Sequence, residues 1–214
     1  MFDEPVKDSP NTAAGVTPEK MAAPQKKRVN VLDVMKPVDV SATLEVVRLS
    51  ENEVAVIAFT PEGENVTLHY CDDPDINGYV QCNGDGCALC LAGKKKEQRV
   101  LLPVYVPTAH AVGVLPVSTS LRPNALMPLL QPVLAANKPT VAFLKKDGPT
   151  KFVVSSSALP PDADGGEAVT VPFLTRWEAG EITLESAFQK IPNAQLKLVP
   201  SIARLLELKG ISVR

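Results

Sequence analysis

The stretch Thr67–Arg99, TLHYCDDPDINGYVQCNGDGCALCLAGKKKEQR, contains all four cysteines of the chain and one of its two histidines. Within it, Cys87 and Cys90 form a C-x2-C pair, and Cys82 lies five positions before Cys87. A zinc ion takes three or four thiolate or imidazole ligands at tetrahedral corners, and a C-x2-C turn supplies two of them from one tight loop. The stretch therefore predicts a structural Zn2+ site.

Two residues could supply the fourth ligand of this site. His69 and Cys71 alternate with Leu68 and Tyr70 on a predicted strand, so both side chains point to the same side. His69 lies thirteen positions before Cys82, and Cys71 follows the histidine by two. From the residues alone, either could join the three other cysteines.

Clustered cysteines can also form disulfides or a redox pair. The N-terminal residues are acidic and polar, without the apolar stretch of a secretory signal, so we expect a cytoplasmic, reducing setting. In that setting, clustered cysteines usually bind a metal or carry out redox chemistry. A thioredoxin-like C-x2-C pair would lie between a strand and a helix, without two further ligands nearby. The sequence therefore favours zinc over a disulfide.

Charge is unevenly distributed along a chain whose net charge is −2. Residues 91–154 carry nine basic and two acidic side chains, a net charge of +7. A basic block of this kind either binds a polyanion or forms a solvated basic surface. No apolar run is long enough to span a membrane, so no membrane association is expected.

The periodicity of apolar residues predicts a mainly β protein with C-terminal helices, and the 20 prolines argue against long helices. We expect strands at 42–49, 53–60, 66–71, 100–106, 110–117, 140–144 and 151–155, with 53–60 and 66–71 paired as a hairpin. Two more hairpins should follow. Helices are expected at 118–137, 171–179, 184–190 and 201–209, the last capped by Ser201 and ended by Gly210.

These elements divide the chain into four expected segments. A disordered arm should occupy 1–28, and a core with an inserted zinc knuckle at 69–93 should occupy 29–157. A linker at 158–170 and a helical C-terminal segment at 171–214 complete the chain. Two strands, a metal insertion, two strands, a helix and a final hairpin are the element order of an OB-like antiparallel barrel.

The sequence resembles the zinc-containing single-stranded DNA-binding proteins of T-even phages over roughly residues 45–155. The matching parts are the histidine on the strand, the cysteine at position 82 with twelve residues between the two, and the terminal C-x2-C. A basic segment, a strand pair and a short helix follow in the same order. In that family the zinc ligands are one histidine and three cysteines, so the resemblance implies His69, Cys82, Cys87 and Cys90 as ligands, with Cys71 as the alternative to His69.

The resemblance, together with the basic block, implies a non-catalytic protein that binds single-stranded DNA, or RNA, in replication or recombination. Basic side chains would neutralise phosphates, and tyrosines would stack on bases. Among the tyrosines we expect Tyr79 and Tyr105 to be the best exposed. The candidate contacts are Lys94, Lys95, Lys96, Arg99, Arg122, Lys145, Lys146, Lys151, Tyr79 and Tyr105.

The alternative function is a zinc-stapled protein-interaction module without nucleic-acid binding. Its partner would bind the apolar C-terminal helix, which could equally recruit replication or recombination proteins to a nucleic-acid-binding protein. An enzyme is not expected. The deaminase pattern of H-x-E with P-C-x-x-C is absent from the sequence, and so are a Walker loop and a G-x-S-x-G elbow.

Overall fold

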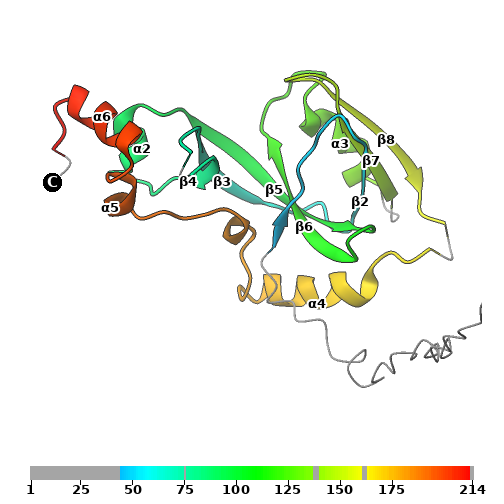
Figure 1. The fold of residues 1–214 in the computed structure, drawn as a ribbon. Coiled ribbons are helices and arrows are strands. Elements are labelled where there is room, and N and C mark those ends of the chain that lie inside the picture. The colour runs from blue at the N-terminus through cyan, green and yellow to red at the C-terminus, as the bar shows by residue number, and fades with distance from the viewer. Residues whose placement is uncertain (1–43, 75, 137–139, 161–162, 213–214) are drawn as a thin grey trace, which may run out of the picture. The chain divides into compact units, whose positions relative to one another are not determined.

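The computed structural model describes residues 44–74, 76–136, 140–160 and 163–212 (Figure 1). The arm predicted at 1–28 and the first part of the predicted core lie outside the described residues. The described strands form one mixed sheet and are followed by C-terminal helices, as the sequence predicted. The strands are β1 (Glu45–Val46), β2 (Val54–Ala58), β3 (Glu64–Cys71), β4 (Gly78–Gln81), β5 (Lys96–Val106), β6 (Ala111–Ser118), β7 (Thr140–Lys146) and β8 (Phe152–Ala158).

The helices are short, in keeping with the proline content. One helix, α3, connects the two hairpins, and another, α2, lies within the metal knuckle. The other described helices lie in the C-terminal part. They are α2 (Ala88–Ala92), α3 (Leu126–Leu134), α4 (Glu167–Glu178), the 3-10 helix η1 (Leu184–Ala187), α5 (Asn193–Leu196) and α6 (Pro200–Leu208). Because α4 begins at Glu167, helical structure starts inside the predicted linker.

The long strand β5 organises the sheet, because both of its edges are used. On one edge it pairs with β6 over its length, and on the other it pairs first with β3 and then with β2. The predicted hairpin of 53–60 with 66–71 is therefore wrong. Its two strands, β2 and β3, lie one after the other along the same edge of β5 instead of pairing with each other. The other two hairpins are present as β5–β6 and β7–β8.

The prolines inside β5 and β6 lie where each strand changes or loses its partner on one edge. Pro103 falls between Leu101, which pairs with β3, and Val104, which pairs with β2. Its missing N–H thus coincides with the change of partner on that edge. Pro116 lies beyond Val114, the last residue of β6 that pairs with β1.

The strand order is β1-β6-β5-β2-β7-β8, with α3 connecting β6 to β7. Among the described residues, no pairing joins the strands at the two ends of this order, so closure into a barrel is not observed. α3 packs on β8 and β6 and covers an apolar core centred on Val117, Leu130 and Leu144. Figure 1 shows α3 beside the β7–β8 hairpin.

A second apolar core belongs to what we call the metal arm, residues 67–96 together with the C-terminal residues 189–211. Its buried members come from β3, β4 and α2 on one side and from α5 and α6 on the other. They are Cys71, Val80, Cys87, Ala88, Leu89, Ala92, Leu196, Ile202 and Leu206. The C-terminal helices therefore complete the arm, as Figure 1 shows for α2, α5 and α6.

Helix α6 differs from its predicted capping. It begins at Pro200 with Val199 as the N-cap residue, and the Ser201 hydroxyl donates a hydrogen bond to Asp73 (2.6 Å) instead of capping the helix. Gly210 follows the helix with a φ of 72°, a left-handed conformation that glycine adopts without strain, so the predicted end is confirmed.

Candidate metal centre and the adjoining groove

Four side chains meet within the metal arm. One ligand atom from each of His69, Cys82, Cys87 and Cys90 lies within 4.8 Å of all the others. His69 comes from β3, Cys82 follows β4, and Cys87 and Cys90 lie at the start of α2. All four cysteines of the chain are free thiols. This cluster could hold a metal ion.

The distances within the cluster suit a tetrahedral metal. Cys90 Sγ lies 3.3 Å from His69 Nε2 and 3.5 Å from Cys82 Sγ, and Cys87 Sγ lies 3.7 Å from His69 Nε2. Ligands about 2.0–2.3 Å from a common centre stand roughly 3.3–3.8 Å apart at tetrahedral corners. These three spacings therefore fit a tetrahedral ion, and the remaining ligand atoms lie within 4.8 Å of one another.

The imidazole of His69 is oriented for ligation. Its Nδ1–H donates a hydrogen bond to the backbone carbonyl of Lys95 (3.0 Å), which leaves the lone pair of Nε2 facing the thiols. A backbone carbonyl on the far nitrogen is a common way to fix the tautomer of a metal-binding histidine. His69 is fully buried, and that burial lowers its pKa, so the neutral ligand form is favoured.

The thiols titrate differently at the two ends of the C-x2-C turn. Burial would raise the pKa of Cys87, but the backbone N–H groups of Cys90, Asn83 and Leu89 outweigh it and lower the pKa below its usual range. Burial, together with hydrogen bonds to Cys82 and Cys87, raises the pKa of Cys90 to about 11. A thiolate at Cys87 is thus favoured, whereas Cys90 gives up its proton when a cation replaces that proton.

Left-handed glycines shape the loop between Cys82 and Cys87. Gly84 and Gly86 each have a φ of 74°, which a residue with a Cβ atom adopts only with strain. Only four residues separate the two cysteines, and these turns reverse the chain within that span. The loop thus delivers Cys82 and the N-terminus of α2 to the same point.

Asn193, on α5, holds this loop from outside. Its Oδ1 accepts hydrogen bonds from the backbone N–H of Ala88 (2.9 Å) and from the Asn83 side chain (2.9 Å), and its Nδ2 donates to the Gly86 carbonyl (3.1 Å). The N–H of Ala88 belongs to the first turn of α2, where no intrahelical acceptor exists. Sequence reasoning missed this residue because the contact joins segments more than 100 positions apart.

Cys71 does not join the cluster. It is fully buried and contributes to the apolar core of the metal arm, while the four-residue group consists of His69 and the other three cysteines. The structure thus assembles the ligand set with His69 as its fourth member. Alternation along β3 placed both residues on one side, and only the folded structure shows that Cys71 packs in the apolar core while His69 faces the other thiols.

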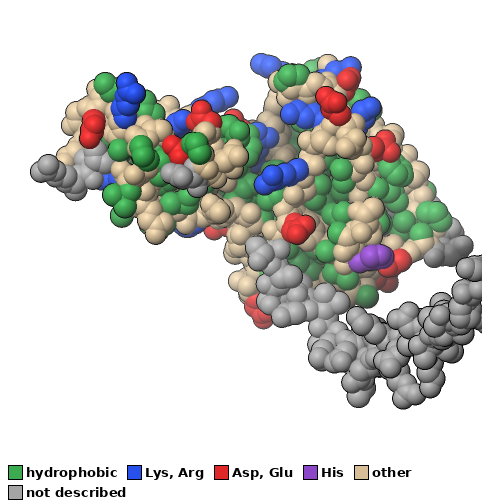
Figure 2. Space-filling view, in the orientation of Figure 1, with side chains coloured by type: hydrophobic (Ala, Val, Ile, Leu, Met, Phe, Trp, Pro, Cys, Tyr) green, Lys and Arg blue, Asp and Glu red, His purple; other side chains and the backbone are tan. Residues whose placement is uncertain are grey.

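A groove of about 1060 Å³ runs between the β3–β4 hairpin of the metal arm and the α3 side of the core. Four cations line it, Arg48, Arg99, Arg122 and Lys146, and none of the described residues lining it is acidic. Figure 2 shows Lys and Arg side chains on both sides of the hollow near the middle of the view. The groove therefore presents positive charge to whatever enters it.

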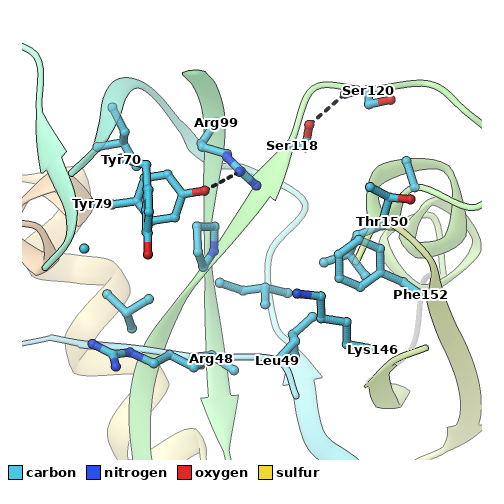
Figure 3. A pocket seen from close by; sticks show the side chains of 18 of the residues that line it. Arg48, Leu49, Tyr70, Tyr79, Arg99, Ser118, Ser120, Lys146, Thr150 and Phe152 are labelled. Carbon is cyan, nitrogen blue, oxygen red and sulfur yellow. Dashed lines mark hydrogen bonds between the residues drawn. The ribbon is translucent and has the colours of Figure 1, made fainter. Parts of the chain in front are cut away.

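Aromatic rings lie on both sides of the same groove. Tyr70 and Tyr79, on neighbouring strands, pack edge to face with ring centroids 5.3 Å apart. Phe152 lies across from them beside Lys146 (Figure 3). Half of the surface of Tyr70 is exposed, which is unusual for so large a ring in a folded protein.

Glu97 and Arg99 fix the ring of Tyr79. The Tyr79 hydroxyl donates to Glu97 (3.1 Å) and accepts from Arg99 (2.9 Å), while Arg99 also pairs with Glu97. Burial raises the pKa of Tyr79. Burial would also raise the pKa of Glu97, but the Arg99 guanidinium and the Tyr79 hydroxyl outweigh it and lower that pKa. The triad is therefore one carboxylate, one guanidinium and one neutral phenol.

The structure separates the predicted nucleic-acid contacts into two groups. Tyr79, Arg99, Arg122 and Lys146 line the groove. The others are elsewhere: Lys94 forms an ion pair with Asp72, Lys151 pairs with Asp147, and Lys95, Lys96 and Lys145 are exposed outside the groove.

The prediction that Tyr105 is exposed is wrong. Only 1% of its surface is accessible, because it points from β5 toward Gly166, where any Cβ atom would lie 2.6 Å from the ring. Its hydroxyl hydrogen-bonds with His110 (3.2 Å). The alternation in β5 does not show which of its faces is covered by α4, so the sequence left the choice of face open.

Sequence reasoning also missed groove residues. Arg48 comes from the segment between β1 and β2, inside the acidic part of the chain, and no charge block marks it. Tyr70 and Phe152 were among the aromatics near enough in sequence to the basic block to supply stacking, but the sequence favoured Tyr79 and Tyr105 over them. The alternation of Tyr70 with the metal ligand His69 was the one available signal, because it places the tyrosine on the opposite face of β3.

Comparison of the chain with protein families, with curated proteins and with solved structures finds no match. Among the described helices, none has the length and apolar character needed to cross a membrane.

Proposed function

We propose that this protein is a non-catalytic single-stranded nucleic-acid-binding protein, with DNA as its preferred ligand and a structural zinc ion in the metal arm. The observation that carries the proposal is the groove, which combines four cations, exposed or half-buried aromatic rings and no acidic lining residue among those described. Cationic tracks with aromatic stacking surfaces are how proteins hold unpaired strands.

The donor set of the metal centre supports zinc. Three thiolates and one imidazole are a common structural zinc set, whereas oxygen ligands would be expected for magnesium or calcium. Four protein ligands leave no coordination position for a water molecule, which is why we assign the ion a structural role and no reaction. His69, Cys82, Cys87 and Cys90 would hold it and thereby fix the wall that carries Tyr70 and Tyr79.

The strand connectivity also supports the proposal. In an OB-fold, a five-stranded barrel, a helix connects the third strand to the fourth, and the strand faces and loops bind oligonucleotides. Strands β2, β5, β6, β7 and β8, with α3 between β6 and β7, follow that connectivity, and the metal arm is inserted between β2 and β5. The resemblance to the phage single-stranded DNA-binding proteins fits the same arrangement.

The interaction-module alternative has lost its main support, because the apolar face of α6 is already occupied. Ile202 and Leu206 are fully buried against α2 within the same chain. Recruitment of replication or recombination proteins would need a different surface.

A titration with fluorescent oligo-dT over a range of salt concentrations tests the proposal. We expect log affinity to fall linearly with log salt, and Arg122→Gln and Lys146→Gln each to reduce the slope by about 0.7. Arg204→Gln, an exposed cation on α6 outside the groove, is the matched control and should leave the slope unchanged. Binding of duplex DNA as tight as that of the single strand, or equal losses from all three variants, would contradict a groove for unpaired strands.

A further inference from the structure

The four cations of the groove are not equivalent. Arg99 makes an ion pair with Glu97, two positions away on β5, and only 22% of its side chain is exposed. Arg48 and Arg122 are exposed, and none of the described carboxylates is within ion-pairing distance of either of them or of Lys146. Arg99 therefore brings little free charge to the groove, because its own partner neutralises it.

The contacts of Arg99 are with the ring of Tyr79. Its guanidinium carbon lies 5.3 Å from the centroid of that ring, and its Nη2 donates to the Tyr79 hydroxyl at 2.9 Å. Glu97 accepts a hydrogen bond from the same hydroxyl. The two charged partners fix the position of the phenol oxygen, since rotation about Cα–Cβ would break both bonds, and the guanidinium near the ring and the packing on Tyr70 favour one ring plane.

The fixed ring supports its exposed neighbour. Tyr70 and Tyr79 are directly opposite each other in the β3–β4 ladder, and their rings meet at an interplanar angle of 65°. Figure 3 shows the two rings together, with the dashed bond from Arg99 to the Tyr79 hydroxyl beside them. Tyr70 thus has an aromatic ring on one side and the open groove on the other.

We propose that Arg99 and Glu97 are positioning residues, which hold Tyr79 so that the Tyr70–Tyr79 wall stacks on unpaired bases. The phosphates then lie on the three other cations of the groove, Arg48, Arg122 and Lys146. This inference rests on the proposed function and adds to it a division of the groove into a base-binding wall and a phosphate-binding wall. It also assigns to Arg99 a role other than phosphate neutralisation.

The salt dependence of binding separates the two roles. Arg99→Gln should weaken oligo-dT binding about five- to tenfold at every salt concentration, because stacking is lost, and should change the salt slope far less than the roughly 0.7 expected for Arg122→Gln. Tyr70→Ala should weaken binding about tenfold or more, also at an unchanged slope. The double variant of Tyr70→Ala with Arg99→Gln should bind oligo-dT only slightly more weakly than Tyr70→Ala alone, because both changes remove the same stacking surface.

A strand without bases provides the second measurement. On an abasic deoxyribose-phosphate oligomer of the same length, the double variant Glu97→Gln with Arg99→Gln, which leaves the local charge unchanged, and the unmodified protein should bind equally, whereas Arg122→Gln should still bind more weakly. The direction in which Glu97→Ala changes the affinity is an independent test. The substitution removes a negative charge beside the groove, which by charge alone would strengthen binding, yet it should weaken binding to oligo-dT because Tyr79 loses its acceptor. Circular dichroism and zinc content of each variant check that the fold is retained.

Three results would overturn the inference while leaving the proposed function standing. They are a drop in salt slope for Arg99→Gln equal to that for Arg122→Gln, weaker abasic binding by the double variant of Glu97 and Arg99, and stronger oligo-dT binding by Glu97→Ala. If the unmodified protein binds no oligonucleotide even at low salt, the proposed function and this inference fail together.

Discussion

Asn193 and Ala88 are 105 positions apart in the chain, and their hydrogen bond of 2.9 Å attaches the C-terminal segment to the helix that carries the metal ligands. The acceptor is a side-chain amide oxygen and the donor is a backbone N–H of the first turn of α2. A distant residue thus provides the cap that α2 lacks in its own sequence.

Replacing Asn193 should therefore weaken the metal centre without touching a ligand. Asn193→Ala should lower the free energy of unfolding by about 1–2 kcal/mol, as loss of a helix cap does. It should also lower zinc affinity, measured by competition with a chromophoric chelator. Gln195→Ala, an exposed residue on the same short helix, is the control. Unchanged zinc affinity in Asn193→Ala would mean that the loop holds its shape without this contact.

The ligand set predicts about one zinc per chain, and the cysteines should not be equivalent. Cys87→Ser and Cys90→Ser should abolish tight zinc binding and disorder the 69–93 region, since folding of such a site depends on its metal. Cys71→Ala is the control, because Cys71 is buried outside the ligand cluster. It should keep one zinc while losing some stability. Metal analysis of the purified variants tests this, and zinc loss from Cys71→Ala would show that the ligand set is wrong.

Zinc binding should release protons and strengthen as the pH rises. The pKa of Cys90 is raised to about 11, so near neutral pH this thiol loses its proton only when the metal binds. Each proton released makes the affinity fall about tenfold per unit decrease in pH. Calorimetry in buffers of different ionisation enthalpy measures the proton count. An affinity that does not change between pH 6 and pH 8 would contradict this reasoning.

Helix α6 offers a matched pair of leucines. Leu206 is fully buried in the core of the metal arm, and Leu208, two positions on, is 76% exposed. Leu206→Ala should lower the free energy of unfolding by about 2–5 kcal/mol, whereas Leu208→Ala should change it by less than about 0.5 kcal/mol. Denaturant melts followed by fluorescence of Trp177 and by circular dichroism compare them. Similar small effects at both positions would mean that α6 is only loosely attached.

The local parts of this structure could be predicted from the sequence. Cysteine spacing gave the cluster, alternation gave the strands, and Gly210 gave the end of α6. Each of these depends on residues a few positions apart, where the side-chain period of a strand or the conformation of glycine decides the outcome.

Contacts between segments that are far apart in the sequence could not be predicted. Tyr105 was expected to be exposed because the sequence does not say which face of β5 receives α4. Arg48 lies in an acidic region, and only the pairing of β1 with β6 brings its neighbourhood to the groove. Lys94 looked like part of a free basic run, but in the fold its Nζ lies 2.7 Å from Asp72 Oδ1 and forms an ion pair.

The distance along the chain between the ligand cluster and its C-terminal cover also sets an order of events during synthesis. The last of the four candidate ligands, Cys90, is synthesised before Asn193, whose bond to Ala88 spans 105 positions of the chain. At about 5–20 residues per second, the interval lasts roughly 5–20 s. Over that interval the nascent knuckle has its ligands but not its cover. An ion that binds during synthesis would therefore enter a loop open to solvent, and α5 and α6 would close over it afterwards.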